Sequence, residues 1–153
     1  MKNQERTEKN KDSAVYKIPC GGCSSAYYGE TSRGVATRIR EHKNDMRLHK
    51  TTNSMVVHAE EYGHLPDWAN TEILHAGLNR LARRTVEAAY IVTEETTNHK
   101  EGFIKLARAP AGIIAAAVRS HKRQSGSRSG ITQATSPPMN QPVTCPNPRQ
   151  PVR

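Results

Sequence analysis

Alternating apolar and polar positions mark the first strand of the chain. The sequence Ala-Val-Tyr-Lys-Ile at residues 14–18 places the alanine, Tyr16 and the isoleucine on one side, and the valine and Lys17 on the other. This alternation predicts a half-buried β-strand, and a short aromatic segment at residues 26–29 predicts a second one. Residues 19–25 lie between them and contain a proline and two adjacent glycines, which predict a tight turn.

Apolar positions that recur at steps of three and four predict helices over residues 33–48, 54–62 and 80–95. In the first helix His42 belongs to the apolar stripe, and the neighbouring stripe is mostly basic. That stripe consists of Ala36, Arg40, Lys43, Arg47 and Lys50. An imperfect alternation predicts a third strand over residues 71–76. We therefore expect the α/β (α+β) class, with a small, largely antiparallel three-stranded sheet flanked by helices.

Residue types at the helix ends support these boundaries. Ser54 is expected to cap the second helix, and Gly63 stands where a glycine usually ends one. Asn79 is expected to cap the third helix in the same way. Trp68, the only tryptophan, is expected to anchor its loop in the core.

Composition and charge divide the chain into a domain and two tails. Residues 1–12 are polar and charged, and residues 109–153 hold seven of the nine prolines with many Ser, Gln, Thr and Asn. We expect both to be disordered basic tails, although 111–119 is compatible with an isolated helix. The folded domain is then expected over 13–108.

The positive charge lies mainly outside that domain. The chain carries +9, of which residues 109–153 contribute +6 and residues 1–11 contribute +2. Inside the domain the charge is polarised, because residues 33–50 hold six basic side chains against two acidic ones. This distribution favours a nucleic-acid backbone as partner, and the alternative is a basic surface that only keeps the protein soluble.

The cysteines and the apolar runs bear on compartment and metal. Three cysteines with one close pair, Cys20 and Cys23, predict a reduced intracellular metal-type pair rather than a disulfide framework, with Cys145 free in the tail. The C-x2-C spacing lets two thiolates reach one tetrahedral ion, and histidines would supply the other ligands. The candidates are His49, His58, His64, His75 and His99. No apolar run approaches the ~20 residues of a membrane span, so we expect a soluble protein.

Several short motifs stand in a fixed order along the chain. Ala14-Val15-Tyr16 is followed, after ten residues, by Tyr27-Tyr28-Gly29, and then by Thr31, Arg38 and His42. In this order and spacing the region of residues 13–106 resembles the GIY-YIG nuclease family. With the Cys20–Cys23 pair between the two motifs, it looks like the endonuclease domain of Penelope-like retroelements. The sequence departs from the name motif where Ala14 replaces a glycine and Tyr28 replaces an isoleucine.

The resemblance implies a function. It predicts a metal-dependent DNA endonuclease that nicks target DNA in the nucleus and so primes reverse transcription of a retroelement. DNA is the implied partner, with element RNA or a reverse transcriptase encoded with it as further candidates. One alternative is a non-catalytic, zinc-stapled nucleic-acid-binding module derived from such a nuclease. Another is a zinc-linked interaction domain without nucleic acid.

The resemblance also implies roles for individual residues. Tyr16 would be the general base or order the attacking water, and Tyr27 would position water or phosphate. Arg38 would pair with the scissile phosphate, and His42 would assist proton transfer or bind phosphate. Glu87 would ligate one catalytic Mg²⁺ or Mn²⁺.

Further residues are assigned to binding. Asn98 would contact phosphate by the same resemblance, and the basic stripe offers Arg40, Lys43 and Arg47 to the nucleic acid. His58 and His64 would complete a structural zinc site with the two cysteines, since the retroelement domains carry such a Cys-Cys-His-His set.

Simpler interpretations remain beside these roles. Tyr16 and Tyr27 are also ordinary strand aromatics, and His42 on an apolar stripe also fits a core histidine. Arg83 and Arg84 precede Glu87 by four and three residues, so an intrahelical ion pair would account for the glutamate. Arg38 also fits a solvated basic face.

Overall fold

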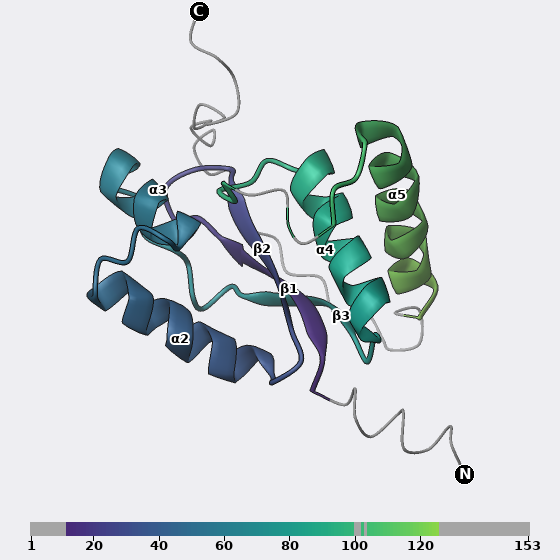
Figure 1. Ribbon diagram of the computed structural model, residues 1–153, viewed down its shortest axis with the longest axis horizontal. Helices are drawn as coiled ribbons and strands as arrows, with labels where there is room; N and C mark the ends of the chain where they lie inside the picture. The colour runs from purple at the N-terminus through teal and green to yellow at the C-terminus, as the bar shows by residue number, and fades with distance from the viewer. Residues whose placement is uncertain (1–11, 100–101, 103, 126–153) are drawn as a thin grey trace, which may run out of the picture.

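The computed structural model describes residues 12–99, 102 and 104–125. A small sheet forms the middle of the structure, with two helices on one face and two on the other (Figure 1). The helices are α2 (Val35–Arg47), α3 (Ser54–Tyr62), α4 (Arg80–Thr93) and α5 (Arg108–Ser125). Helices α2 and α3 flank one side of the sheet, and α4 covers the other with α5 outside it.

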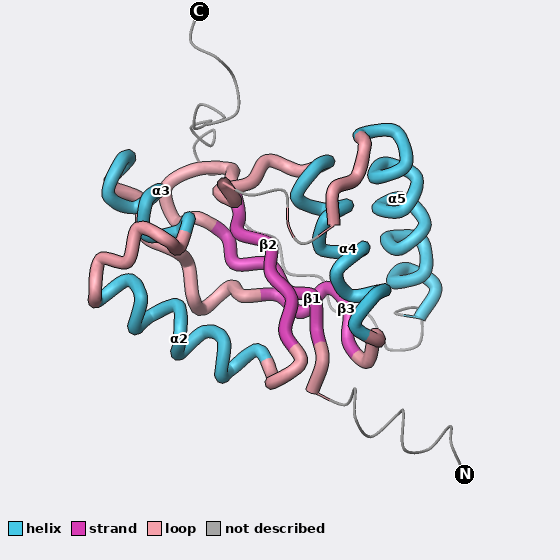
Figure 2. Tube along the Cα trace, in the orientation of Figure 1, coloured by secondary structure: helices cyan, strands magenta, loops and turns pink. Residues whose placement is uncertain are grey.

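The sheet has three strands in the order β2-β1-β3, all antiparallel. The strands are β1 (Ala14–Pro19), β2 (Ala26–Thr31) and β3 (Glu72–Ala76). Figure 2 shows them in magenta between the cyan helices. The predicted three-stranded antiparallel sheet flanked by helices is therefore confirmed.

The register of β1 against β2 sets the positions of the tyrosines. Tyr16 lies opposite Gly29, and Ile18 lies opposite Tyr27. Because side chains alternate between faces, Tyr28 points to the side opposite Tyr16 and Tyr27. The two motifs that the sequence separates by a turn thus become neighbours in adjacent strands.

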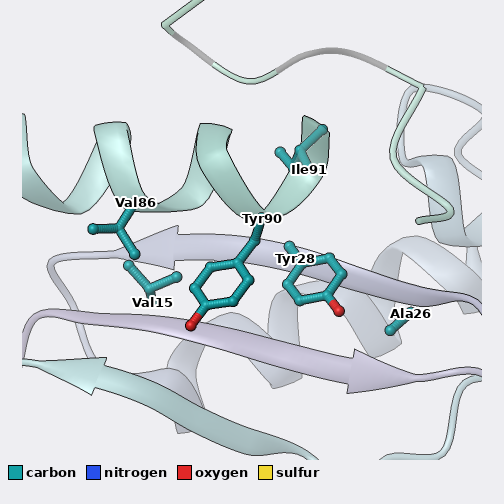
Figure 3. Packing of buried hydrophobic residues seen from close by; sticks show 6 residues of the cluster. All are labelled: Val15, Ala26, Tyr28, Val86, Tyr90 and Ile91. Carbon is teal, nitrogen blue, oxygen red and sulfur yellow. The ribbon is translucent and has the colours of Figure 1, made fainter. Parts of the chain in front are cut away.

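The face under α4 is closed by apolar contacts. Tyr28 stacks on Tyr90 of α4 with centroids 5.5 Å apart and rings 1° from parallel. Val15, Val86 and Ile91 belong to the same buried cluster (Figure 3). Large side chains buried in this way are each worth about 1.5–3 kcal/mol, which fixes α4 on the sheet.

The face under α2 and α3 contains a second core. Tyr16, Ile18 and Met55 are buried there, and Trp68 packs against them. The expected anchoring of the loop by Trp68 is confirmed, and Lys43 Nζ lies 5.5 Å above its ring.

At the ends of α3 and α4, two of the three expected residues have the predicted role. Gly63 ends α3 in the left-handed conformation with φ of 69°, and Asn79 caps α4 by accepting a hydrogen bond from the Ala82 amide. The cap of α3 is Asn53, not Ser54, since Asn53 Oδ1 accepts from the Met55 amide. Ser54 is instead the first helical residue.

The expected domain boundary at residue 108 differs from the structure. Residues 108–125 form α5, which is longer than the isolated helix compatible with 111–119 and packs on α4. The small side chains of Ala111 and Ala115 are fully buried against Ala89, so the two helices approach closely. The prediction of a disordered tail rested on the polar, basic composition of residues 109–153, which outweighed the few small apolar residues that pack on α4. The remaining parts of both predicted tails, 1–11 and 126–153, lie outside the described residues.

None of the described helices combines the length and the apolar character that a bilayer crossing requires.

Candidate functional site

The Tyr16 ring occupies space that is free because Gly29, the residue opposite it in β2, has no side chain. A Cβ on Gly29 would stand 2.5 Å from Tyr16 Oη and 2.9 Å from the ring of Tyr27. Only glycine leaves this space, so the glycine of the second motif lets both rings lie over β2. Burial strongly raises the pKa of Tyr16, and the neighbouring phenol of Tyr27 adds to the rise while Arg38 opposes it.

His42 of α2 contacts both tyrosines. Its Nε2 lies 2.9 Å from Tyr16 Oη, and its ring meets the Tyr27 ring edge-on at 5.0 Å. Its Nδ1 lies 2.9 Å from Asn53 Nδ2, so both ring nitrogens are engaged. Burial, with the charge of Arg38, lowers the pKa of His42 to about 4. His42 is thus a neutral, hydrogen-bonded histidine, and it has no free nitrogen with which to bind phosphate.

Arg38 lies one helical turn before His42 on the same side of α2. Its Nη1 pairs with Glu41 Oε2 at 2.5 Å, and its charge favours the ionised forms of Tyr16 and Tyr27. Its Nε is buried and has no hydrogen-bond partner among the described residues. The guanidinium therefore retains a donor for a further anion.

Glu87 is a buried carboxylate with an unused oxygen. The two arginines before it on α4, Arg83 and Arg84, both pair with Glu30 of β2. Within the described part of the chain, Glu87 Oε2 has no hydrogen-bond partner. Burial and the charge of Glu30 raise the pKa of the Glu87 carboxyl to about 7, which Arg84 and Arg38 oppose. A buried oxygen in this state is suited to a cation.

Two clefts meet at Tyr27 and Glu87. One, of about 250 Å³, is also lined by Arg33 and Arg38. The other, of about 640 Å³, extends past Asn53 toward the start of α3. Arg38 and Glu87, whose Nε and Oε2 atoms are buried without a partner in the described residues, both line the smaller cleft. Glu87 lines both clefts, and it is the residue that the sequence analysis assigned to a catalytic metal.

The basic stripe lies elsewhere on α2. Arg40, Lys43 and Arg47 are exposed, and none of them lines either cleft. With 100° per residue, their mean direction is roughly opposite to that of Arg38 around the helix. Their predicted contact with nucleic acid would therefore use the outer surface of α2.

Asn98 has a different use from the predicted phosphate contact. Its Oδ1 accepts from the Tyr28 amide and its Nδ2 donates to the Tyr28 carbonyl, both at 2.9 Å. Thr96 Oγ1 also donates to Asn98 Oδ1 at 2.6 Å. The buried side chain thus pairs with the free edge of β2 in the manner of a strand. This pairing holds the strand that carries Tyr27.

A Cys-Cys-His-His cluster lies at the other end of the hairpin. One ligand atom from each residue, Cys20, Cys23, His58 and His64, lies within 4.8 Å of all the others. His58 Nε2 is 3.3 Å from Cys20 Sγ and 3.7 Å from Cys23 Sγ. Tetrahedral zinc with ordinary bond lengths would separate a sulfur and a nitrogen ligand by roughly 3.6 Å. These residues could hold a metal ion such as zinc.

Local backbone geometry brings this cluster together. A Cβ on Gly22 would stand 2.5 Å from the His64 ring, so glycine is required where the turn crosses the histidine. The Gly22 amide donates to Cys20 Sγ at 3.4 Å, as expected for an amide that orients a thiolate. The cluster joins the β1–β2 turn to α3.

The competing histidines have other contacts. His49 Nδ1 pairs with Glu60 at 2.9 Å, and His75 Nε2 lies 3.1 Å from Tyr90 Oη. His99 lines the larger cleft. Of the five candidate histidines, all of which lie in the described residues, only His58 and His64 join the two cysteines in the cluster.

The sequence did not single out Asn53 or Glu30 as site residues. Asn53 bonds His42 from the start of α3, and Glu30 neutralises the two arginines beside Glu87. A polar residue just before a helical stripe is a signal for a cap, but the partner of its amide depends on the tertiary fold.

Comparison of the chain with protein-family models, with curated proteins and with solved structures found no match.

Proposed function

We propose that this protein is a metal-dependent endonuclease that hydrolyses a phosphodiester bond in DNA. The observation that carries the proposal is that Tyr27, Arg38 and Glu87 line one cleft, while the buried Tyr16 and His42 lie directly against the Tyr27 ring. They come from β1, β2, α2 and α4, which are distant in sequence. A solvated basic face or an intrahelical ion pair does not explain this convergence.

The protein groups divide the work of hydrolysis. The Tyr16 oxygen accepts a proton from the attacking water, with the phenolate favoured by the positive charge of Arg38 and by the hydrogen bond to His42. Arg38 donates to the phosphate through a guanidinium whose planar fork suits two oxygens. Tyr27 lines the cleft together with Arg38 and orients the water or the phosphate.

Glu87 would hold the catalytic Mg²⁺ or Mn²⁺, which when bound stabilises negative charge on phosphate oxygens and lowers phenol and water pKa values. A bound cation would also relieve the cost of a buried carboxylate. Burial raises the pKa of Tyr16 when no cation is bound, so we expect activity only in the presence of the divalent metal.

The Cys-Cys-His-His cluster would hold a structural zinc. Four protein ligands leave no open position for chemistry, and a small domain gains stability from a metal that ties its turn to a helix. In the cell, the resemblance favours nicking of nuclear DNA to prime retroelement reverse transcription, with element RNA or a reverse transcriptase as further partners.

The test is conversion of supercoiled plasmid to open-circle DNA with Mg²⁺ or Mn²⁺, using zinc-loaded protein. Wild type should nick, and Glu87→Gln should lose activity by about 10³-fold or more, because the metal loses its protein ligand. Glu72→Gln, which changes an exposed carboxylate on β3, should nick as wild type does.

A folded, zinc-loaded wild type that binds DNA but stays inert across several divalent metals would contradict the proposal. The non-catalytic binding module would then replace it. Salt-dependent DNA binding separates that module from a domain without nucleic acid, since phosphate contacts release counterions.

A further inference from the structure

Asn53 joins the start of α3 to the tyrosine cluster by three hydrogen bonds. Its Oδ1 accepts from the Met55 amide at 3.2 Å, and its Nδ2 lies 2.9 Å from His42 Nδ1. The same Nδ2 donates to Asp45 Oδ2 at 3.3 Å. One amide thus caps a helix and reaches two residues of α2.

The orientation of the Asn53 amide is fixed by two partners of opposite kind. The Met55 amide can only donate, so the atom facing it is the oxygen. The ionised Asp45 carboxylate can only accept, so the atom facing it is the nitrogen. Asn53 therefore donates to His42 Nδ1.

This donation determines which nitrogen of His42 carries the proton. A ring nitrogen that accepts a hydrogen bond has a lone pair, so Nδ1 is unprotonated. In the neutral ring the proton then lies on Nε2, which is 2.9 Å from Tyr16 Oη. His42 is the donor of that bond and Tyr16 is the acceptor.

We propose that Asn53 is a positioning residue that holds His42 in the Nε2–H tautomer and so makes the Tyr16 oxygen the acceptor in their hydrogen bond. This inference rests on the proposed function and adds a direction to its proton transfer. His42 stabilises the Tyr16 phenolate and does not take its proton.

The consequence for the reaction is a defined direction of proton movement. The phenolate oxygen of Tyr16 takes one proton from water, and the water oxygen forms a bond to phosphorus as the bond to the leaving oxygen breaks. The leaving alkoxide takes a proton from solvent, and the Tyr16 phenol returns its proton to solvent before the next turnover. His42 keeps its Nε2 proton throughout. Protonation of His42 at Nδ1 would place two hydrogen-bond donors, Nδ1–H and the Asn53 amide, opposite each other. Burial and the charge of Arg38 also lower the pKa of His42, and the nearby carboxylates of Asp45 and Glu41 act in the opposite direction.

The decisive variant exchanges the donor for an acceptor while keeping the cap. In the double variant Asn53→Asp/Asp45→Asn, the new carboxylate can still accept from Met55, and the net charge is unchanged. That carboxylate accepts from His42 Nδ1–H, so the ring proton should move to Nδ1. Histidine ring ¹⁵N NMR of the full chain reads this directly, with His42→Gln identifying the signal.

Nicking by the double variant should fall by about 10²-fold or more, because the Tyr16 oxygen loses its donor. Asp45→Asn alone keeps Asn53 and should retain both the Nε2–H tautomer and most activity. Asn79→Asp makes the same substitution at the cap of α4 and should leave both readouts unchanged. Thermal melts of all variants establish that each is folded.

Two results would overturn the inference. One is a His42 ring that keeps its proton on Nε2 in the double variant. The other is a ring that changes tautomer while nicking continues at the rate of the Asp45→Asn control. If wild type binds DNA but never nicks, the proposed function fails, and the NMR result still decides separately whether Asn53 sets the tautomer.

Discussion

The two faces of the sheet use the same residue types in different ways. Tyr27 and Tyr28 are consecutive in β2, but they point to opposite sides. Tyr28 stacks flat on Tyr90 in an apolar cluster, whereas Tyr27 meets His42 edge-on and lines two clefts with Glu87. The α4 face is closed by packing, and the α2/α3 face combines a small core with directed hydrogen bonds.

The difference shows where polar groups are tolerated in a small domain. In the apolar cluster under α4 the contacts are non-directional, so a change of side chain there alters stability in proportion to the area that it uncovers. On the α2/α3 face Tyr16, His42 and Asn53 each need a particular partner at a particular atom. Loss of one partner leaves a buried polar group unsatisfied and should cost function before it costs the fold.

The sharpest test of this comparison removes one hydroxyl from each face. Tyr16→Phe should reduce plasmid nicking by about 10²–10⁴-fold, because it deletes the proton acceptor while keeping the ring. Tyr28→Phe should nick within about twofold of wild type. Equal losses in the two variants, measured with matched zinc content, would break the comparison.

Zinc removal should affect the α2/α3 face more than the α4 face. If the cluster binds zinc, the metal should add about 4 kcal/mol to the free energy of unfolding when free zinc is 1,000-fold above its Kd. Chelation should remove this contribution and lower the melting temperature by roughly 10 °C or more. Amides of α3 should lose hydrogen-exchange protection before those of α4. An unchanged melt after verified metal removal would show that the cluster does not act as a staple.

Acid should weaken the wild type through His42. Its pKa falls from 6.5 in the unfolded chain to about 4 in the fold, so between these values the unfolded chain binds more protons. The contribution is present above pH 6.5 and is lost as pH falls toward 4, by up to about 3 kcal/mol. Urea melts of His42→Gln should lack this slope, while the exposed-site control His49→Gln should follow the wild-type curve.

Glycine substitutions give the smallest contrast. Gly29→Ala should destabilise the fold by about 1–3 kcal/mol and displace Tyr16, since the new Cβ would stand 2.5 Å from its oxygen. Gly112→Ala in α5 meets no atom within 4 Å and should stabilise by about 0.4–1 kcal/mol. Urea melts of both variants check the sign, and a neutral Gly29→Ala would mean that the rings can shift without cost.

Local patterns in the sequence were enough to predict most of the sheet and helices. Alternation predicted β1, and helical spacing predicted α2, with its ends within two residues, because each pattern reflects burial of one side. The choice of His58 and His64 needed the family resemblance as well, since five histidines were available and spacing alone does not select two.

The sequence could not predict contacts that depend on tertiary placement. An asparagine amide can donate to phosphate, but the Asn98 amide forms hydrogen bonds with the backbone of Tyr28, seventy residues away in the sequence. Asn53 looked like a residue before a cap, and its bond to His42 arises only when α3 folds against α2. The α4–α5 seam rests on alanines, which carry little hydropathic contrast.

The pairing of Asn98 with Tyr28 leaves the sheet with two unlike borders. Backbone groups of residues 95–97 and the Asn98 amide already occupy the β2 border from Ala26 to Tyr28. In the described part of the chain, the β3 border has no further strand beside it. Unpaired strand borders are the places where another chain can add a strand. An added strand would therefore meet less obstruction beside β3 than beside the first half of β2.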